Sequence, residues 1–177
     1  ETGYVDLKES CLRSETTVKV FDQMRKLQSY TDEGSPGRDW NVATGMVIEG
    51  KAGFQIMGDW AKGEFTAAGK TPGVDYYCSP TPSNNGYLYN VDSFIFYKTS
   101  DPDKQEGQKL LAKLMMGKNF QKVFNLYKGS IPARLDVSMD EFDKCAKTSN
   151  ADIKTAGASG GLVPSFAHGM AQGNTMK

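Results

Sequence analysis

The sequence predicts an α/β fold, and two segments carry that prediction: a strand-to-helix junction at residues 50–65 and a long alternating run at residues 87–98. In residues 52–57, Ala, Phe and Ile alternate with Gly, Gln and Met, which is the two-residue period of a strand with a buried face. Residues 61–65 favour a helix that Trp60 opens. Because ligands of open α/β sheets usually lie at such strand ends, Trp60 either offers a flat surface to a ligand or packs into the core.

Size and composition are those of one soluble domain, or of one domain plus part of another. The chain has 177 residues, of which 38% are hydrophobic and 11% aromatic. It has no run of about 18 apolar residues, so we expect no transmembrane segment. Basic and acidic residues both number 21 and are scattered, so nucleic acid is not an expected partner. The first residues, ETGYVDLKES, do not form a secretory signal, and we expect that a signal was removed or that the start of the protein is missing.

The cysteine and histidine pattern does not indicate a metal site. The three cysteines show no CxxC spacing, and His168 is the single histidine of the sequence. No other cofactor is indicated either. A catalytic triad built on His168 would need a serine or cysteine partner that the sequence does not identify.

Two interpretations of the cysteines fit the sequence. Cys78 follows a predicted strand at residues 74–77, and Cys145 ends a predicted short helix that starts at residue 140. In an oxidising compartment these two would form a disulfide and leave Cys11 free. The alternative is three buried thiols.

The first third of the chain predicts two helices. Ser14 caps one of them, an amphipathic covering helix whose apolar positions recur at helical spacing: Val18, Phe21, Met24 and Leu27. A turn-rich loop leads to Asp39, which caps a second helix at residues 40–49, and Gly50 is suited to end it. Trp40 opens this helix after a polar loop, as Trp60 does in its own. The two indoles therefore either form the aromatic walls of one site or belong to the core.

Polar residues interrupt the aromatic strand predicted at residues 87–98. The two-residue period places Asn90 and Asp92 on the same side of it. An amide and a carboxylate are costly to bury without partners. Their partners are either hydroxyl groups of a ligand or groups from a nearby loop.

The second half of the chain predicts helices at residues 105–116, after a capped turn, and at 119–128, where Gly129 ends the helix. Lys128 lies in the last turn, a position that suits a cation and is also common for a solvated lysine. Two weaker helices are predicted at residues 140–147 and 151–157. His168 follows in a loop of small residues, where a lone histidine is most often exposed.

Four segments together carry a resemblance to a known family: GRDWNVATGMVIEGKAGFQIMGDWAKGEF, YNVDSF, YKGSIPAR and AHGM. In this order and spacing the chain resembles the periplasmic glucose- and mannose-binding proteins of ABC sugar importers, a branch of the family 1 extracellular solute-binding proteins. The resemblance implies a type II periplasmic-binding-protein fold with two lobes around a sugar. Residues 1–177 resemble the C-terminal part of such a protein, mostly the second lobe, with the first lobe and last helices missing.

The resemblance also implies a ligand set. It assigns aromatic platforms to Trp40 and Trp60, and polar sugar contacts to four further side chains: Asn90, Asp92, Lys128 and His168. The implied partners are a monosaccharide, glucose with mannose or galactose as alternatives, and an ABC permease in the membrane. The implied protein is a periplasmic monomer without enzyme activity. The alternative from another class is a carbohydrate hydrolase that uses Asp92 with a second carboxyl group.

Overall fold

The structure, a computed structural model, describes residues 8–82 and 86–165. The described residues form two compact units. Of the described residues, the first unit contains 8–39, 86–91 and 155–165, and the second contains 40–82 and 92–154. In the described parts of the chain, no helix is long and apolar enough to cross a membrane.

The first unit contains helices α1 (Glu9–Leu12) and α2 (Glu15–Gln28) and strands β1 (Tyr87–Tyr89) and β2 (Leu162–Pro164). The prediction of α2 is confirmed: the Ser14 hydroxyl accepts a hydrogen bond from the Thr17 amide at 3.3 Å. Its apolar side is exposed, however, with Phe21 58% accessible. The two strands pair in parallel, with Tyr87 opposite Leu162, a pairing the sequence did not predict.

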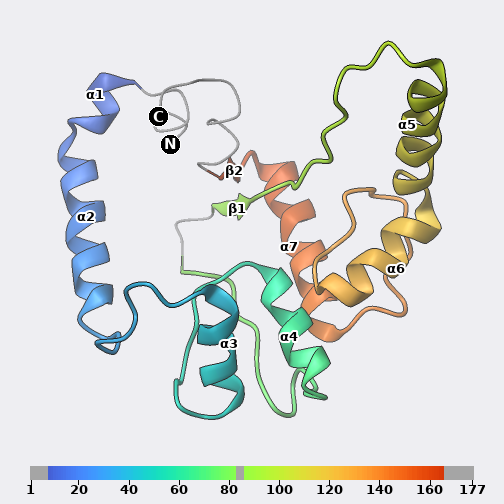
Figure 1. Cartoon of the computed structure of the whole chain (residues 1–177). Coiled ribbons are helices and arrows are strands. Elements are labelled where there is room, and N and C mark those ends of the chain that lie inside the picture. Colours follow the sequence, from blue (N-terminus) through green and yellow to red (C-terminus); the bar gives the residue numbers. More distant parts are fainter. Residues whose placement is uncertain (1–7, 83–85, 166–177) are drawn as a thin grey trace. The chain divides into compact units, whose positions relative to one another are not determined.

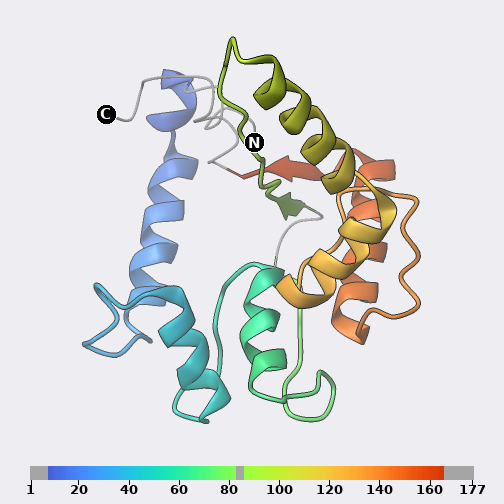
Figure 2. The same cartoon turned by 45° about the vertical axis from the view of Figure 1, so that its right-hand side comes forward.

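The second unit is mainly helical. Its elements are listed in chain order: α3 (Trp40–Ile48), the short 3-10 helix η1 (Asp59–Ala61), α4 (Lys62–Ala67), α5 (Pro102–Met115), α6 (Lys118–Lys128) and the first part of α7 (Lys144–Ser159). Helix α4 packs against both α3 and α6, and α4 and α6 lie side by side in both views (Figure 1, Figure 2). The predictions of α3, α4 and α6 are confirmed. Gly50 (φ 71°) and Gly129 (φ 88°) end α3 and α6 in the left-handed conformation that glycine adopts at little cost.

Helices α5 and α7 differ from prediction at their start because of local capping. The Asp101 carboxylate accepts a hydrogen bond from the Asp103 amide at 3.0 Å, so α5 begins earlier, at Pro102. Helix α7 is one continuous helix rather than two. The Asp143 carboxylate accepts from the Ala146 amide at 2.8 Å, which places Cys145 at the start of α7 rather than at the end of a helix.

The predicted strands are wrong in three places. Residues 52–57 are not a strand, and Phe54 is 95% exposed. Residues 74–77 lie in a turn closed by an isolated bridge between Pro72 and Tyr76. The strand predicted at residues 87–98 ends at Tyr89. An alternating sequence becomes a strand only where a neighbouring strand takes up its backbone hydrogen bonds. Among the described residues, 52–57, 74–77 and 90–98 have no neighbouring strand.

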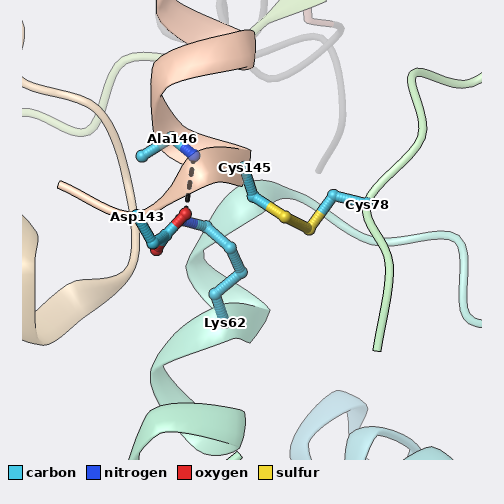
Figure 3. Close-up of a disulfide and its surroundings, with 5 residues drawn as sticks. All are labelled: Lys62, Cys78, Asp143, Cys145 and Ala146. Carbon is cyan, nitrogen blue, oxygen red and sulfur yellow. Dashed lines mark hydrogen bonds and ion pairs between the residues drawn. A yellow bond between two sulfur atoms is a disulfide. The ribbon is translucent and has the colours of Figure 1, made fainter. Parts of the chain in front are cut away.

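The second unit is held together around the start of α7. A small buried cluster contains Val137, Phe142 and Ala146. The disulfide between Cys78 and Cys145 is confirmed, and Cys11 is free. Figure 3 shows Lys62 reaching from α4 to Asp143, beside this disulfide. The Lys62 ammonium lies 2.8 Å from the Asp143 carboxylate, and the lysine is only 6% exposed.

A nearby tyrosine gives a testable prediction, because its hydroxyl is buried and has no hydrogen-bond partner among the described residues. The Tyr76 ring stacks on Phe65 with ring centroids 4.1 Å apart. Tyr76→Phe keeps this stack and removes the hydroxyl, so we expect the free energy of unfolding at pH 7 to rise by about 1 kcal/mol. Urea denaturation measures this change. A fall in stability would contradict the expectation, since it would mean that the hydroxyl makes a favourable contact.

The same variant also has an expected pH dependence. Burial, aided by the Asp143 charge, raises the pKa of Tyr76 from 10.0 to about 12. Above pH 10 the tyrosine therefore ionises in the unfolded chain before it ionises in the folded one, and the native protein loses stability as the pH rises from 10 to about 12. In Tyr76→Phe this part of the alkaline loss is expected to be absent.

Candidate functional site

The start of α4 and the end of α6 approach each other through two glycines. A Cβ atom built on Gly63 would lie 2.9 Å from the Lys128 carbonyl oxygen. One built on Gly129 would lie 2.7 Å from the Gly63 nitrogen. No larger residue fits either position without moving the backbone. The two segments that carry the GDWAKGEF and KGSIPAR strings are therefore in direct backbone contact.

A half-buried carboxylate, that of Asp59, adds a hydrogen bond to this contact. The Ile131 amide donates to Asp59 Oδ2 at 3.2 Å, across 72 positions of the sequence. Burial raises the pKa of the Asp59 carboxyl, while a hydrogen bond from Ser130, the charges of Lys62 and Lys128, and the Ile131 amide act in the opposite direction. The Asp59 side chain thus joins the turn after α6 to the start of the helix that carries Trp60.

Trp60 lies in η1, and its indole is placed over its own turn. A Cβ atom built on Gly58 would lie 2.0 Å from the six-membered part of the ring, so the indole rests against this glycine. The side chain is half-buried. Trp60 therefore keeps part of its aromatic surface accessible, at the helix start that contacts the end of α6.

Lys128 is paired rather than solvated. Its ammonium forms an ion pair with the Asp92 carboxylate, and the lysine side chain is 28% exposed against 64% for the aspartate. The ammonium also lies 5.8 Å from the centre of the Phe124 ring, a cation–π distance. The end of a helix stabilises a cation further. The pair presents one charge of each sign next to an aromatic ring.

The remaining predicted ligands are placed differently. Trp40 begins α3 and is 37% exposed, so it is not a core residue, and its carbonyl accepts a hydrogen bond from Gln55 at 3.0 Å. Asn90 belongs to the first unit, where its side-chain oxygen accepts from the Ser165 hydroxyl at 2.8 Å. Because β1 ends at Tyr89, the strand pattern that placed Asn90 and Asp92 on one side is wrong. His168 lies outside the described residues.

Of the six predicted ligands, Trp60 lies just before α4 and Lys128 ends α6, the two segments that are in backbone contact, and Lys128 pairs with Asp92. Sequence reasoning missed two residues that shape this junction. Neither Asp59 nor Phe124 is among the six predicted ligands. A glycine within a helix is unfavourable unless another backbone approaches it, so Gly63 was a signal that pointed to the contact. Within residues 8–82 and 86–165, no cluster of His, Cys, Asp or Glu side chains is suited to hold a metal ion.

Comparison with known proteins gives a consistent set of relatives. Residues 3–155 match the family described as bacterial extracellular solute-binding protein. The chain is 47% identical over 176 residues to a probable sugar-binding periplasmic protein of Brucella suis, covering 99% of this chain and 42% of that protein. It is 48% identical over 168 residues to a protein of the same description from Mesorhizobium japonicum, covering 94% and 40%.

A more distant relative carries a more specific name. A xylose/arabinose-binding protein of Haloferax volcanii is 28% identical over 157 residues, which cover 87% of this chain and 33% of that protein. The chain thus spans about two fifths of the length of the Brucella and Mesorhizobium proteins.

Proposed function

Because this chain belongs to the bacterial extracellular solute-binding proteins, we propose that the protein containing it binds a neutral monosaccharide in the periplasm and delivers it to an ABC importer. The relatives from Brucella and Mesorhizobium, named as sugar-binding periplasmic proteins, support the ligand class and the compartment. The specific ligand we propose is a glucose-like aldohexose, with mannose and galactose as alternatives.

The observation that supports this proposal most is the junction of α4 and α6, where the Lys128 carbonyl lies against Gly63, three residues after Trp60, and the Lys128 ammonium pairs with Asp92. A hexose has an apolar C–H face that stacks on an indole and a ring of hydroxyl groups that both donate and accept hydrogen bonds. A carboxylate accepts from such hydroxyls and an ammonium donates to them, and bonds to ions are the stronger ones.

The other parts of the site belong to the same proposal. Trp40, Asn90 and His168 supply further contacts to the sugar, as the family resemblance implies. Residues 1–177 form the C-terminal part of a type II periplasmic binding protein that acts as a monomer. The first lobe closes over the sugar by a hinge motion, and the closed form is recognised by the permease.

The hydrolase alternative has less support. Asp92 is paired with an ammonium, and Asp59 is bound to the Ile131 amide, so these two carboxylates do not form an acid–base pair. The relatives named above are described as binding proteins.

Calorimetric titration of the native protein with glucose, mannose, galactose and xylose tests the proposal. We expect a dissociation constant of about one micromolar for the preferred hexose, equivalent to about 8 kcal/mol. Asp92→Asn is expected to weaken this binding about tenfold, because it removes a charged acceptor and leaves Lys128 without its partner.

The matched control is Asp136→Asn. Asp136 is also a carboxylate in an ion pair, with Arg134 and Lys118, but it lies outside the proposed site. We expect its replacement to leave the affinity unchanged. No binding of any of the four sugars would contradict the proposal, and turnover of a chromogenic glycoside that is lost in Asp92→Asn would favour the hydrolase.

A further inference from the structure

We propose that Asp59 is a positioning residue for the sugar site: its bond to the Ile131 amide fixes the turn that follows Lys128 against the helix start that carries Trp60. This inference rests on the proposed function, because the geometry it controls is that of the sugar ligands. Neither the family resemblance nor the named relatives assign a role to Asp59.

The bond joins the two segments that carry Trp60 and Lys128. Asp59 directly precedes Trp60, and Ile131 follows the turn that begins at Lys128. On the other side of the junction, the Lys128 carbonyl lies against Gly63. Contacts on both sides therefore hold the two ligand-bearing residues. The glycine contact alone is a steric fit, and the Asp59 bond is the directional link between the two segments.

The turn that follows Lys128 is built on a left-handed glycine. Gly129 is buried, has a φ of 88°, and lies so close to the Asp59 carbonyl that a Cβ atom on it would be 3.2 Å away. A left-handed glycine turn leaves the direction of the following chain open unless something fixes it. The Ile131 amide is the group that Asp59 fixes. A shift of this turn moves the last residue of α6, which is Lys128.

The Asp59 carboxylate does not serve to stabilise its own helix, η1. The residue before it, Gly58, makes no side-chain cap, and the Asp59 carboxylate accepts from a residue 72 positions away. Burial raises the pKa of this carboxyl, so the charged form is held at a cost in stability. An asparagine would accept the same amide hydrogen bond without burying a charge. The bond to Ile131 therefore requires an oxygen that accepts, which either a carboxylate or an amide side chain supplies, and not a charge.

The test uses the native protein, glucose titration by calorimetry, and two variants that differ in one property. Asp59→Ala removes the acceptor, and we expect it to weaken glucose binding about tenfold or more. Asp59→Asn keeps an oxygen that accepts from Ile131, and we expect its affinity to stay within about threefold of the native value. Because Asp59→Asn no longer buries a charge, its stability at pH 7 should equal or exceed the native one. If Asp59 had only a structural role, affinity and stability would change together in both variants.

A double variant shows whether Asp59 acts through Lys128. In a Lys128→Met background, Asp59→Ala is expected to cost no more than about twofold further in affinity, since the group it positions is gone. Full additivity of the two losses would overturn the proposal. Glu64→Ala is the matched control, because it removes another carboxylate from the first turn of α4 and should leave the affinity unchanged.

Amide hydrogen exchange separates this inference from the proposed function. We expect the Ile131 amide to be protected in the native protein and in Asp59→Asn, and to exchange faster in Asp59→Ala. If the native protein bound none of the four sugars, the proposed function and the sugar role of Asp59 would both be wrong, while the exchange data would still show whether Asp59 fixes the turn. If the native protein bound glucose and Asp59→Ala bound it equally well, only this inference would be overturned. Should Asp59→Ala fail to fold, Asp59→Ser, whose shorter side chain does not reach the amide, is judged by the same criteria.

Discussion

Replacing Trp60 with alanine is expected to weaken glucose binding by about 3 kcal/mol, roughly a hundredfold, the range typical of a central aromatic contact. In the proposed site the indole supplies the aromatic platform, and stacking on a pyranose depends on its apolar surface. Trp60 rests on Gly58 and is half-buried, so its removal should lower the stability less than the affinity. Calorimetry with glucose measures the affinity, and thermal unfolding measures the stability.

Two further variants make the Trp60 result specific. Trp60→Phe keeps a smaller aromatic face and should retain an intermediate affinity. Tyr30→Ala removes an aromatic side chain that is 78% exposed and lies in the first unit, and it should have no effect. An unchanged affinity in Trp60→Ala would exclude the indole as a ligand. It would favour a protein that acts as a structural or sensory partner without binding the sugar at this position.

The second large effect is expected from the disulfide. Replacing both Cys78 and Cys145 with serine should lower the free energy of unfolding by about 4 kcal/mol, because the bond closes a long loop in the unfolded chain. The two residues are 67 positions apart in the sequence. Urea denaturation of the native and variant proteins under oxidising conditions measures the difference.

The third cysteine, Cys11, provides the matched control for the disulfide variant. Cys11→Ser should be neutral, because Cys11 is free. The disulfide holds the start of α7 where Asp143 binds the buried Lys62 of α4 (Figure 3). We therefore expect the double variant to lose some sugar affinity together with stability. A loss of stability below about 1 kcal/mol would contradict the loop-closure account.

The candidate site was predicted in part. Motif resemblance assigned Lys128, Asp92 and Trp60 as ligands, and in the structure Lys128 pairs with Asp92. Their partners were not predicted, because the bond between Asp59 and Ile131 and the ion pair between Lys128 and Asp92 join residues 72 and 36 positions apart. No local pattern in a sequence encodes which distant residue a carboxylate will meet.

Most helices and their ends follow from local sequence signals, although these did not reveal that α7 is one continuous helix. Ser14, Asp101 and Gly129 act on backbone groups within a few residues of themselves, so their effect can be read from their neighbours alone. Only the tertiary structure decided which alternating segments became strands and which charged residues met. A strand completes its hydrogen bonds with a distant segment, as Tyr87 does with Leu162, whereas a helix completes nearly all of its own.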